Sequence, residues 1–324
     1  MACKTISNLV NRAGLCYGVK DRGDSDGRFY SMKRLDQLST NVLRNALRFT
    51  GKVHIVQPDS LKEEELAEHQ PGVLIASALD SNYVAVLDPL DGSGNADASI
   101  CTGTVFGIFE ENESGNDDPE NDTEENLIQS VLQPGKNMRA AGYCLYSSAT
   151  VLVFTLGDTV MGFTLDPQLN EFVLTHPNLT IPQRGNVYSC NEANSEGWND
   201  DMKSYLKSLK TGENDSGQRY AHRYVGSMVG DIHRTLLYGG IFCYPADSGQ
   251  HPEGNLQLLY KSAPMAFVVE KAGGMSMNST GESLLEAQPE RVHQKSPCFM
   301  GSPQDVQELK RYICKTANKT ETTE

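Results

Sequence analysis

The stretch Asp88-Pro89-Leu90-Asp91-Gly92-Ser93-Gly94-Asn95 is the part of this sequence that carries the most chemical information. It follows a short apolar run, Tyr83 to Leu87, which predicts a β-strand that stops at Asp88-Pro89. The two carboxylates lie three residues apart in a loop stiffened by proline and glycine, so they can converge on one point. Carboxylate and carbonyl oxygens are the ligands that Mg²⁺ prefers, which makes Asp88, Asp91 and the Leu90 carbonyl candidate metal ligands.

The two glycines of this loop suit a bound anion. Gly92 and Gly94 let the backbone approach a ligand closely, and backbone N–H groups in such a loop can face phosphate oxygens. A turn of aspartate and glycine that merely closes a hairpin is the alternative, and the residue types alone leave both interpretations open.

Outward from this loop, the apolar pattern predicts irregularly alternating strands and helices, which favours layered α/β packing over a regular repeat. Helices are expected over residues 32–49, 200–209, 231–237 and 263–272, and from residue 302 onward; strands are expected over 101–109, 149–155 and 159–165. His233, on the third of these helices, is expected to be structural rather than catalytic.

The composition restricts the possible partners. The 324 residues carry a formal net charge of −14, which repels nucleic-acid phosphate and anionic lipid, so neither is an expected partner. No apolar run approaches the length of about 18 residues that a membrane span needs, and no targeting peptide is predicted. The eight cysteines are scattered without a C-x-x-C pair, which is typical of reduced thiols in a cytoplasmic protein.

The motif D-P-L-D-G-S resembles the metal- and phosphate-binding signature of the inositol monophosphatase and fructose-1,6-bisphosphatase superfamily. The surrounding NYVAVLDPLDGSGNADASICTGTVFGIF, residues 82–109, is similar to the class-1 fructose-1,6-bisphosphatase family, with the plastid-type enzyme nearest. Further similar segments are LQPGKNMRAAGYCLYSSA, GFTLDPQLNEFVLT, RYVGSMVGDIHRTLLYGGIFCYP, SAPMAFVVEKAGG and HQKSPCFMGSPQDVQEL. They extend over roughly residues 30–315.

The resemblance implies an α/β layered sandwich of five layers, the sugar-phosphatase fold of that superfamily. It implies an N-terminal half, residues 1–182, that carries the metal loop, and a C-terminal half, residues 183–324, that binds the sugar phosphate. The active site would lie between the halves, and the protein would be a homotetramer.

The resemblance also implies roles for individual residues. Asp88, Asp91 and the Leu90 carbonyl would bind Mg²⁺ or Mn²⁺, and Asp91, Gly92, Ser93 and Gly94 would hold the phosphate that is removed, although the family has a second serine where Gly94 stands. The second phosphate would contact Asn191, Tyr224 and Tyr244, and Arg223 would reach into a neighbouring subunit's site. The implied reaction is metal-dependent hydrolysis of fructose 1,6-bisphosphate to fructose 6-phosphate and phosphate, with sedoheptulose 1,7-bisphosphate as the alternative substrate.

Several positions depart from the family pattern. If Ser77 corresponds to the serine of the family's Ser-Glu-Glu, Ala78 and Leu79 replace both glutamates, and Asp80 is the nearest carboxylate and a candidate catalytic residue. An alignment through Gln57-Pro58-Asp59 instead recovers one carboxylate at most. The family sequence L-L-Y-E is Leu258-Leu259-Tyr260-Lys261 here. A lysine that points inward would weaken metal binding, because like charges about 4 Å apart repel by roughly 4 kcal/mol at an effective dielectric constant of 20.

Two cations are missing as well, because Asn255 and Gln257 stand where the family has phosphate-binding Lys and Arg. These losses favour a second hypothesis of another class. In it, the chain is a catalytically impaired paralogue that acts by binding a sugar phosphate or an active homologue.

Overall fold

A computed structural model describes residues 1–13, 25–51, 53–56, 73–78, 82–111, 124–249 and 251–320 of the chain. The helices are α1 Ala2–Asn11, α3 Ser25–Arg48, α4 Glu124–Val131, α5 Asp200–Thr211, α6 Met228–Tyr238, α7 Ala263–Lys271 and α8 Pro303–Thr320. Short 3₁₀ turns are η3 Ser93–Ala98, η4 Gly135–Asn137 and η5 Glu192–Gly197, and η6 Leu258–Ser262 is a π-helical turn.

The strands form two large sheets and one small ladder. An eight-stranded antiparallel sheet contains, in spatial order, β1 Val53–Val56, β2 Leu74–Ala78, β3 Tyr83–Asp91, β4 Thr102–Glu110, β5 Met138–Tyr146, β6 Thr150–Thr155, β7 Val160–Asp166 and β8 Glu171–His176. A five-stranded sheet has the order β10 Ala221–His222, β9 Val187–Cys190, β11 Ile241–Tyr244, β15 Cys298–Gly301 and β13 Met275–Met277. The ladder pairs β12 Leu256–Gln257 with β14 Lys295–Ser296.

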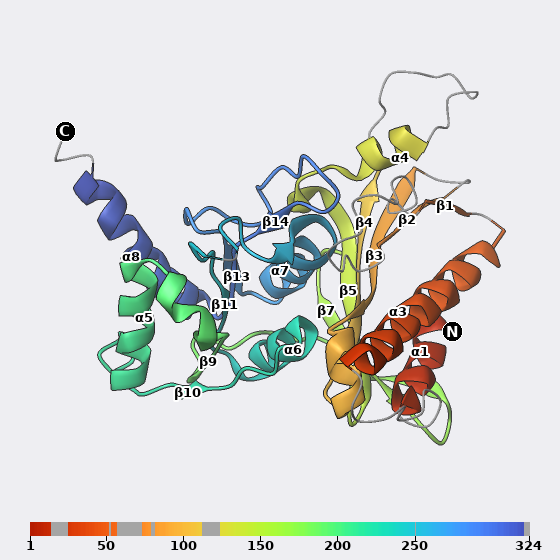
Figure 1. The fold of residues 1–324 in the computed structure, drawn as a ribbon, viewed down its shortest axis with the longest axis horizontal. Coiled ribbons are helices and arrows are strands. Elements are labelled where there is room, and N and C mark those ends of the chain that lie inside the picture. Colours follow the sequence, from red (N-terminus) through yellow and green to blue (C-terminus); the bar gives the residue numbers. More distant parts are fainter. Residues whose placement is uncertain are drawn as a thin grey trace.

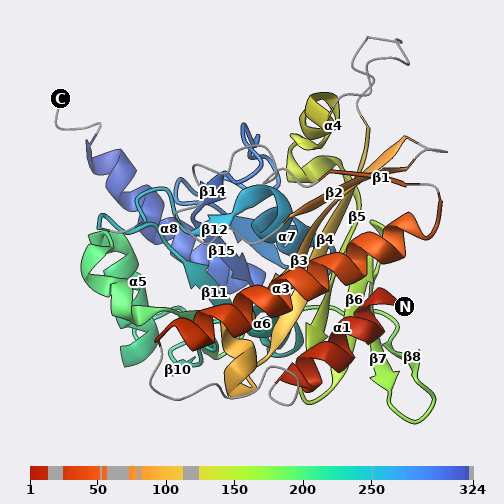
Figure 2. The same cartoon turned by 45° about the vertical axis from the view of Figure 1, so that its right-hand side comes forward.

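These elements stack in five layers, which confirms the predicted layered α/β architecture (Figure 1). Helices α1 and α3 cover one face of the eight-stranded sheet, and α6 and α7 lie between the two sheets. Helices α5 and α8 cover the outer face of the five-stranded sheet. Figure 2 shows the long helix α3 running across the front of the first sheet. The buried side chains between the sheets, such as Val105, Ile232 and Met265, form the largest apolar core.

The predicted helices form, with ends that differ by a few residues. Helix α6 begins at Met228 rather than Asp231, since Ser227 precedes it in extended conformation. Helix α5 begins where expected, because the Asn199 side chain accepts a hydrogen bond from the Met202 N–H at 2.9 Å.

The end of strand β3 differs from the prediction. The strand continues through Pro89 to Asp91 instead of stopping at Leu87. Asp88 lies opposite Val105 and Asp91 opposite Gly103, so β3 has one residue more than β4 between these pairs. This is a β-bulge, the place in a strand where a residue without an N–H donor is tolerated.

Candidate active site

The bulge in β3 brings two carboxylates to one place. The Thr104 hydroxyl of β4 donates a hydrogen bond to the Pro89 carbonyl at 2.8 Å and stabilises the bulge. Asp88 and Asp91 are 1% and 4% exposed, and both contact the same ammonium group. The predicted convergence of the two side chains is therefore present.

The glycine loop that follows packs against the start of helix α6. Gly92 has a φ of 71°, and a Cβ there would lie 3.1 Å from Ser227 Oγ, so this position favours glycine on two grounds. Asn95 Nδ2 donates to the Gly226 carbonyl at 3.0 Å, and the Val229 N–H donates to Asp91 Oδ2 at 3.4 Å. The loop and the N-terminus of α6 thus face one another.

Lys261 points inward and contacts both carboxylates. Its Nζ lies 2.9 Å from Asp91 Oδ1 and 3.1 Å from Asp88 Oδ2. Burial alone would lower the pKa of Lys261, but the charges of Asp88 and Asp91 outweigh it and hold the pKa above its usual value. Burial raises the pKa of Asp88 to about 6 while the Lys261 charge opposes the rise, so Asp88 is mostly ionised above pH 7.

The residues present do not fit the divalent metal ion that the resemblance implies. Nothing in the described ranges groups three His, Cys, Asp or Glu side chains so that they could hold an ion. Both Asp88 oxygens are buried and accept no well-directed hydrogen bond from the residues described, so they retain capacity for a cation. The cation they meet is Lys261. A divalent ion about 4 Å from that ammonium would be repelled by roughly 8 kcal/mol at an effective dielectric constant of 20.

Asp36 also faces this site, although its sequence context does not mark it as a site residue. It lies on α3, which contacts β3 and η3. Burial raises its pKa to about 7, a hydrogen bond with Ser93 opposes the rise, and the charge of Asp88 adds to it. Its only sequence signal is an acidic residue within the otherwise basic stretch Lys33-Arg34-Leu35-Asp36, which resembles the solvated face of a helix.

The raised pKa of Asp36 predicts a pH-dependent effect of Asp36→Asn. A carboxyl whose folded-state pKa is raised contributes stability below about pH 4 that is lost as the pH rises toward 7. Asparagine stays neutral, so the variant should gain about 2 kcal/mol relative to wild type between pH 5 and pH 8. Urea unfolding of both proteins at these two pH values measures the gain. An equal difference at both would mean that Asp36 does not titrate in this range.

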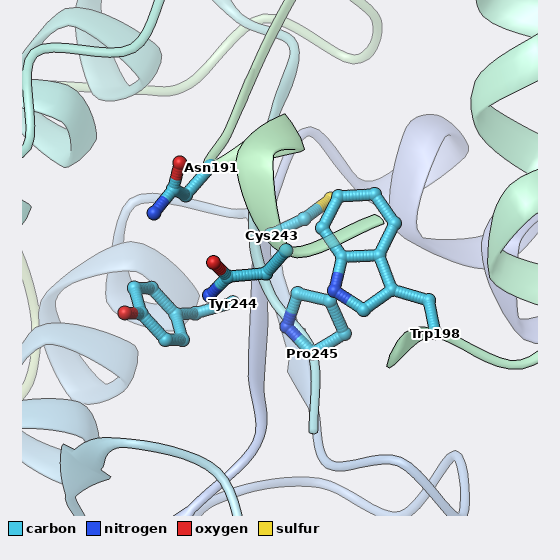
Figure 3. A pocket seen from close by; sticks show the side chains of 6 residues that line it. Asn191, Trp198, Cys243, Tyr244 and Pro245 are labelled. Atoms are coloured by element: carbon cyan, nitrogen blue, oxygen red, sulfur yellow. The ribbon is translucent and has the colours of Figure 1, made fainter. Parts of the chain in front are cut away.

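The residues expected at the second phosphate lie at the adjoining ends of β9 and β11. These strands are parallel neighbours, so Asn191 and Tyr244, near their carboxyl ends, come together. They line a shallow, solvent-open hollow together with Asn194, Trp198, Cys243 and Pro245. Figure 3 shows Asn191 and Tyr244 on one side of this hollow and Trp198 on the other. Asn255 Nδ2 contacts the Tyr244 hydroxyl at 3.3 Å.

The pKa of Tyr224 responds both to Tyr244, which lines the hollow, and to Asp91 of the carboxylate pair. Tyr224 is half-buried just before α6, and its pKa is raised by burial first and then by Tyr244 and other groups that include Asp91. It is therefore a neutral phenol at physiological pH. Arg223 beside it is exposed, and its Nη1 donates to the His222 carbonyl at 2.8 Å.

Two further expectations concern His233 and Asp80. His233 is buried with its Nδ1 2.7 Å from the Tyr143 hydroxyl, and burial lowers its pKa to about 4, which suits a structural role. Asp80 lies outside the described residues, as does Leu79.

Comparison with known proteins finds fructose-1,6-bisphosphatases among the similar sequences. The family profile described as "Fructose-1-6-bisphosphatase, N-terminal domain" matches residues 1–177, and the one described as "Fructose-1-6-bisphosphatase, C-terminal domain" matches residues 181–314. The chloroplastic fructose-1,6-bisphosphatase of Brassica napus is 43% identical over 97% of this chain and 75% of its own. The cytosolic enzyme of Oryza sativa subsp. indica is 41% identical over 96% of this chain and 86% of its own.

Solved structures agree with the sequence comparison. The crystal structure of Leishmania major fructose-1,6-bisphosphatase in holo form has a TM-score of 0.79 and 37% identity, and the match covers 96% of this chain and 90% of that one. The T-state crystal structure of the same protein gives 0.79 and 38%. Both domain profiles and the identity along nearly the whole length show that this chain belongs to the fructose-1,6-bisphosphatase family, a family of phosphoric monoester hydrolases.

Proposed function

We propose that this chain hydrolyses the 1-phosphate of fructose 1,6-bisphosphate and releases fructose 6-phosphate. The observation that carries the proposal is the 43% identity to a fructose-1,6-bisphosphatase over 97% of the chain, with the loop from Asp88 to Asn95 folded between α6 and β4. Sedoheptulose 1,7-bisphosphate is the alternative substrate of the same class.

The chain's own residues supply binding groups at both ends of such a substrate. The backbone N–H groups of Gly92, Ser93 and Gly94 are the proposed contacts of the 1-phosphate. Asn191, Tyr224 and Tyr244 are the proposed contacts of the other phosphate, since all three carry hydrogen-bond donors and two of them, Asn191 and Tyr244, line the hollow.

Asp36 is the residue we propose for proton transfer. Two features support it: burial raises its pKa to about 7, and it shares a hydrogen bond with Ser93 of the loop. We propose this role in place of the one expected for Asp80.

The family implies dependence on a divalent metal ion such as Mg²⁺ or Mn²⁺, whose expected contacts are Asp88, Asp91 and the Leu90 carbonyl. A metal ion in this family would neutralise phosphate charge and activate a water molecule. In this chain Asp88 and Asp91 contact Lys261 instead, so turnover is expected to be slow.

A second candidate function follows from the same ion pairs. Because Lys261 engages both carboxylates, the chain can be a catalytically impaired paralogue that binds a sugar phosphate or assembles with an active homologue. Exposed Arg223 is the residue we propose to contact a neighbouring subunit, in a homotetramer.

Phosphate release from fructose 1,6-bisphosphate separates the two candidates. With saturating Mg²⁺ or Mn²⁺, we expect release about 100-fold or more below that of the Brassica napus enzyme assayed alongside, and none from the Asp91→Asn control. Calorimetric binding of fructose 1,6-bisphosphate without any release would favour the binding paralogue. If the folded protein neither binds nor hydrolyses fructose 1,6-bisphosphate, both the proposed hydrolysis and the sugar-phosphate-binding role are contradicted, and assembly with an active homologue is the role that is left.

The roles of the two halves of the chain and the cellular compartment of the protein are also proposals. We propose that residues 1–182 carry the loop and residues 183–324 carry the sugar-phosphate hollow, since the family profiles meet between residues 177 and 181. The similar proteins include both chloroplastic and cytosolic enzymes. We propose a cytoplasmic location because Cys3, Cys101, Cys144, Cys190, Cys243 and Cys298 are all free thiols. Of the described helices, none is long and apolar enough to cross a bilayer.

A further inference from the structure

We propose that Lys261 is a resident cation of the candidate site, which takes the place of a divalent metal ion between Asp88 and Asp91 and excludes that ion. The inference deepens the proposed function, because it concerns the same carboxylate pair and explains why turnover should be slow. Its first support is geometric: one ammonium group reaches both carboxylates, at 2.9 and 3.1 Å.

Burial makes this arrangement more than a surface ion pair. The Lys261 residue is 9% exposed, and Asp88 and Asp91 are 1% and 4% exposed. Exposed lysines form ion pairs that contribute little, since solvent screens them and their side chains are mobile. A buried ammonium between two buried carboxylates is strongly held, because each group would be left uncompensated without the others.

The backbone around Lys261 holds the ammonium in this position. Lys261 belongs to the π-helical turn η6, which leads directly into α7 and contacts both β3 and β4. Every residue of that turn is buried, and Tyr260 anchors it through a 2.8 Å hydrogen bond between its hydroxyl and His293 Nδ1. Since π-helical turns occur frequently at functional sites, the distortion itself marks this segment. The burial of the whole turn therefore fixes the Lys261 backbone next to β3 and β4.

The net charge of the site explains why neither a divalent metal ion nor a phosphate group is strongly attracted to it. Lys261 supplies one positive charge to the two carboxylates, and the triad keeps a net charge of −1, with Asp36 adjoining. A divalent ion would have to displace the ammonium, and a phosphate dianion at the neighbouring loop meets no excess of positive charge. Substrate affinity should therefore depend mainly on the hollow around Asn191 and Tyr244.

Metal titration without any sugar phosphate tests the inference independently of the proposed reaction. Mn²⁺ is titrated by calorimetry into wild type, Lys261→Glu and the matched control Lys271→Glu, which makes the same charge change at an exposed position on α7. We expect uptake of Mn²⁺ by Lys261→Glu alone. Its melting temperature should rise by about 3 °C or more with Mn²⁺, while those of wild type and the control stay unchanged.

Two outcomes would overturn the inference. Uptake of one Mn²⁺ per wild-type chain that Asp91→Asn abolishes would show that Lys261 does not exclude the metal, and this test does not require the Lys261→Glu variant to fold. Folded Lys261→Glu that takes up no Mn²⁺ would show that something other than Lys261 prevents binding. Because no substrate is present, both outcomes are distinct from a failure of fructose 1,6-bisphosphate hydrolysis.

Discussion

Replacement of Lys261 by methionine should destabilise the protein by about 3–5 kcal/mol at pH 7.5. Methionine has a similar length but no charge, so Asp88 and Asp91 would remain buried next to each other without a counter-ion. Two carboxylates that share a buried place resist ionisation, so their pKa values should rise in the variant. The loss of stability should therefore be larger at pH 8 than at pH 5, where protonation relieves the repulsion.

Urea unfolding of wild type and Lys261→Met at both pH values measures this loss. Lys271→Met is the matched control: Lys271 is exposed on α7 and contacts only the Phe267 ring among the interactions described, so its replacement should cost about 1 kcal/mol or less. A loss below about 1 kcal/mol in Lys261→Met, or one independent of pH, would mean that the ammonium does not compensate the carboxylates.

The second large effect is expected at Arg184, which lies in the chain segment that connects β8 to β9. Arg184 Nη1 lies 3.2 Å from Asp305 Oδ1 and 2.6 Å from Glu308 Oε2 on helix α8. Both acidic side chains are almost fully buried, at 0% and 3% exposure. Arg184→Met should cost about 3 kcal/mol, at the low end for a broken buried pair. The low value is expected because Asp305 still accepts hydrogen bonds from Tyr220 and from the Gly185 N–H.

Arg311→Met provides the comparison, because Arg311 lies on α8, the helix that carries Asp305 and Glu308. Arg311 pairs with Asp215 at the surface, where both side chains are about half exposed, so its loss should cost about 0–1 kcal/mol. Denaturant unfolding of the two variants side by side gives the difference. Equal losses would show that the buried position of Asp305 and Glu308 adds nothing to the strength of the Arg184 contacts.

The local chemistry of the loop could be predicted from sequence, because its determinants are adjacent in the chain. Asp88, Asp91, Gly92 and Gly94 define it, and the structure shows the two carboxylates together and Gly92 in the left-handed region. The predicted end of β3 was wrong. The proline after Asp88 suggested that the strand stops there, but β3 has a bulge at this point and continues to Asp91. A bulge depends on the neighbouring strand, which the local pattern does not reveal.

The contribution of distant residues could not be predicted in the same way. Asp36 lies in a helix with ordinary polar spacing, and nothing in that spacing says that its face meets Ser93. For Lys261, the effect on metal binding depends on whether the side chain points inward, and only the packing of the η6 turn against β3 and β4 decides that direction. In both cases the missing information is tertiary.

The most direct measurement is anomalous X-ray scattering from crystals of wild-type protein grown with Mn²⁺. We expect Lys261 Nζ between Asp88 and Asp91, with no anomalous peak there. A Mn²⁺ peak bound by these two carboxylates, with the Lys261 side chain turned away, would contradict it.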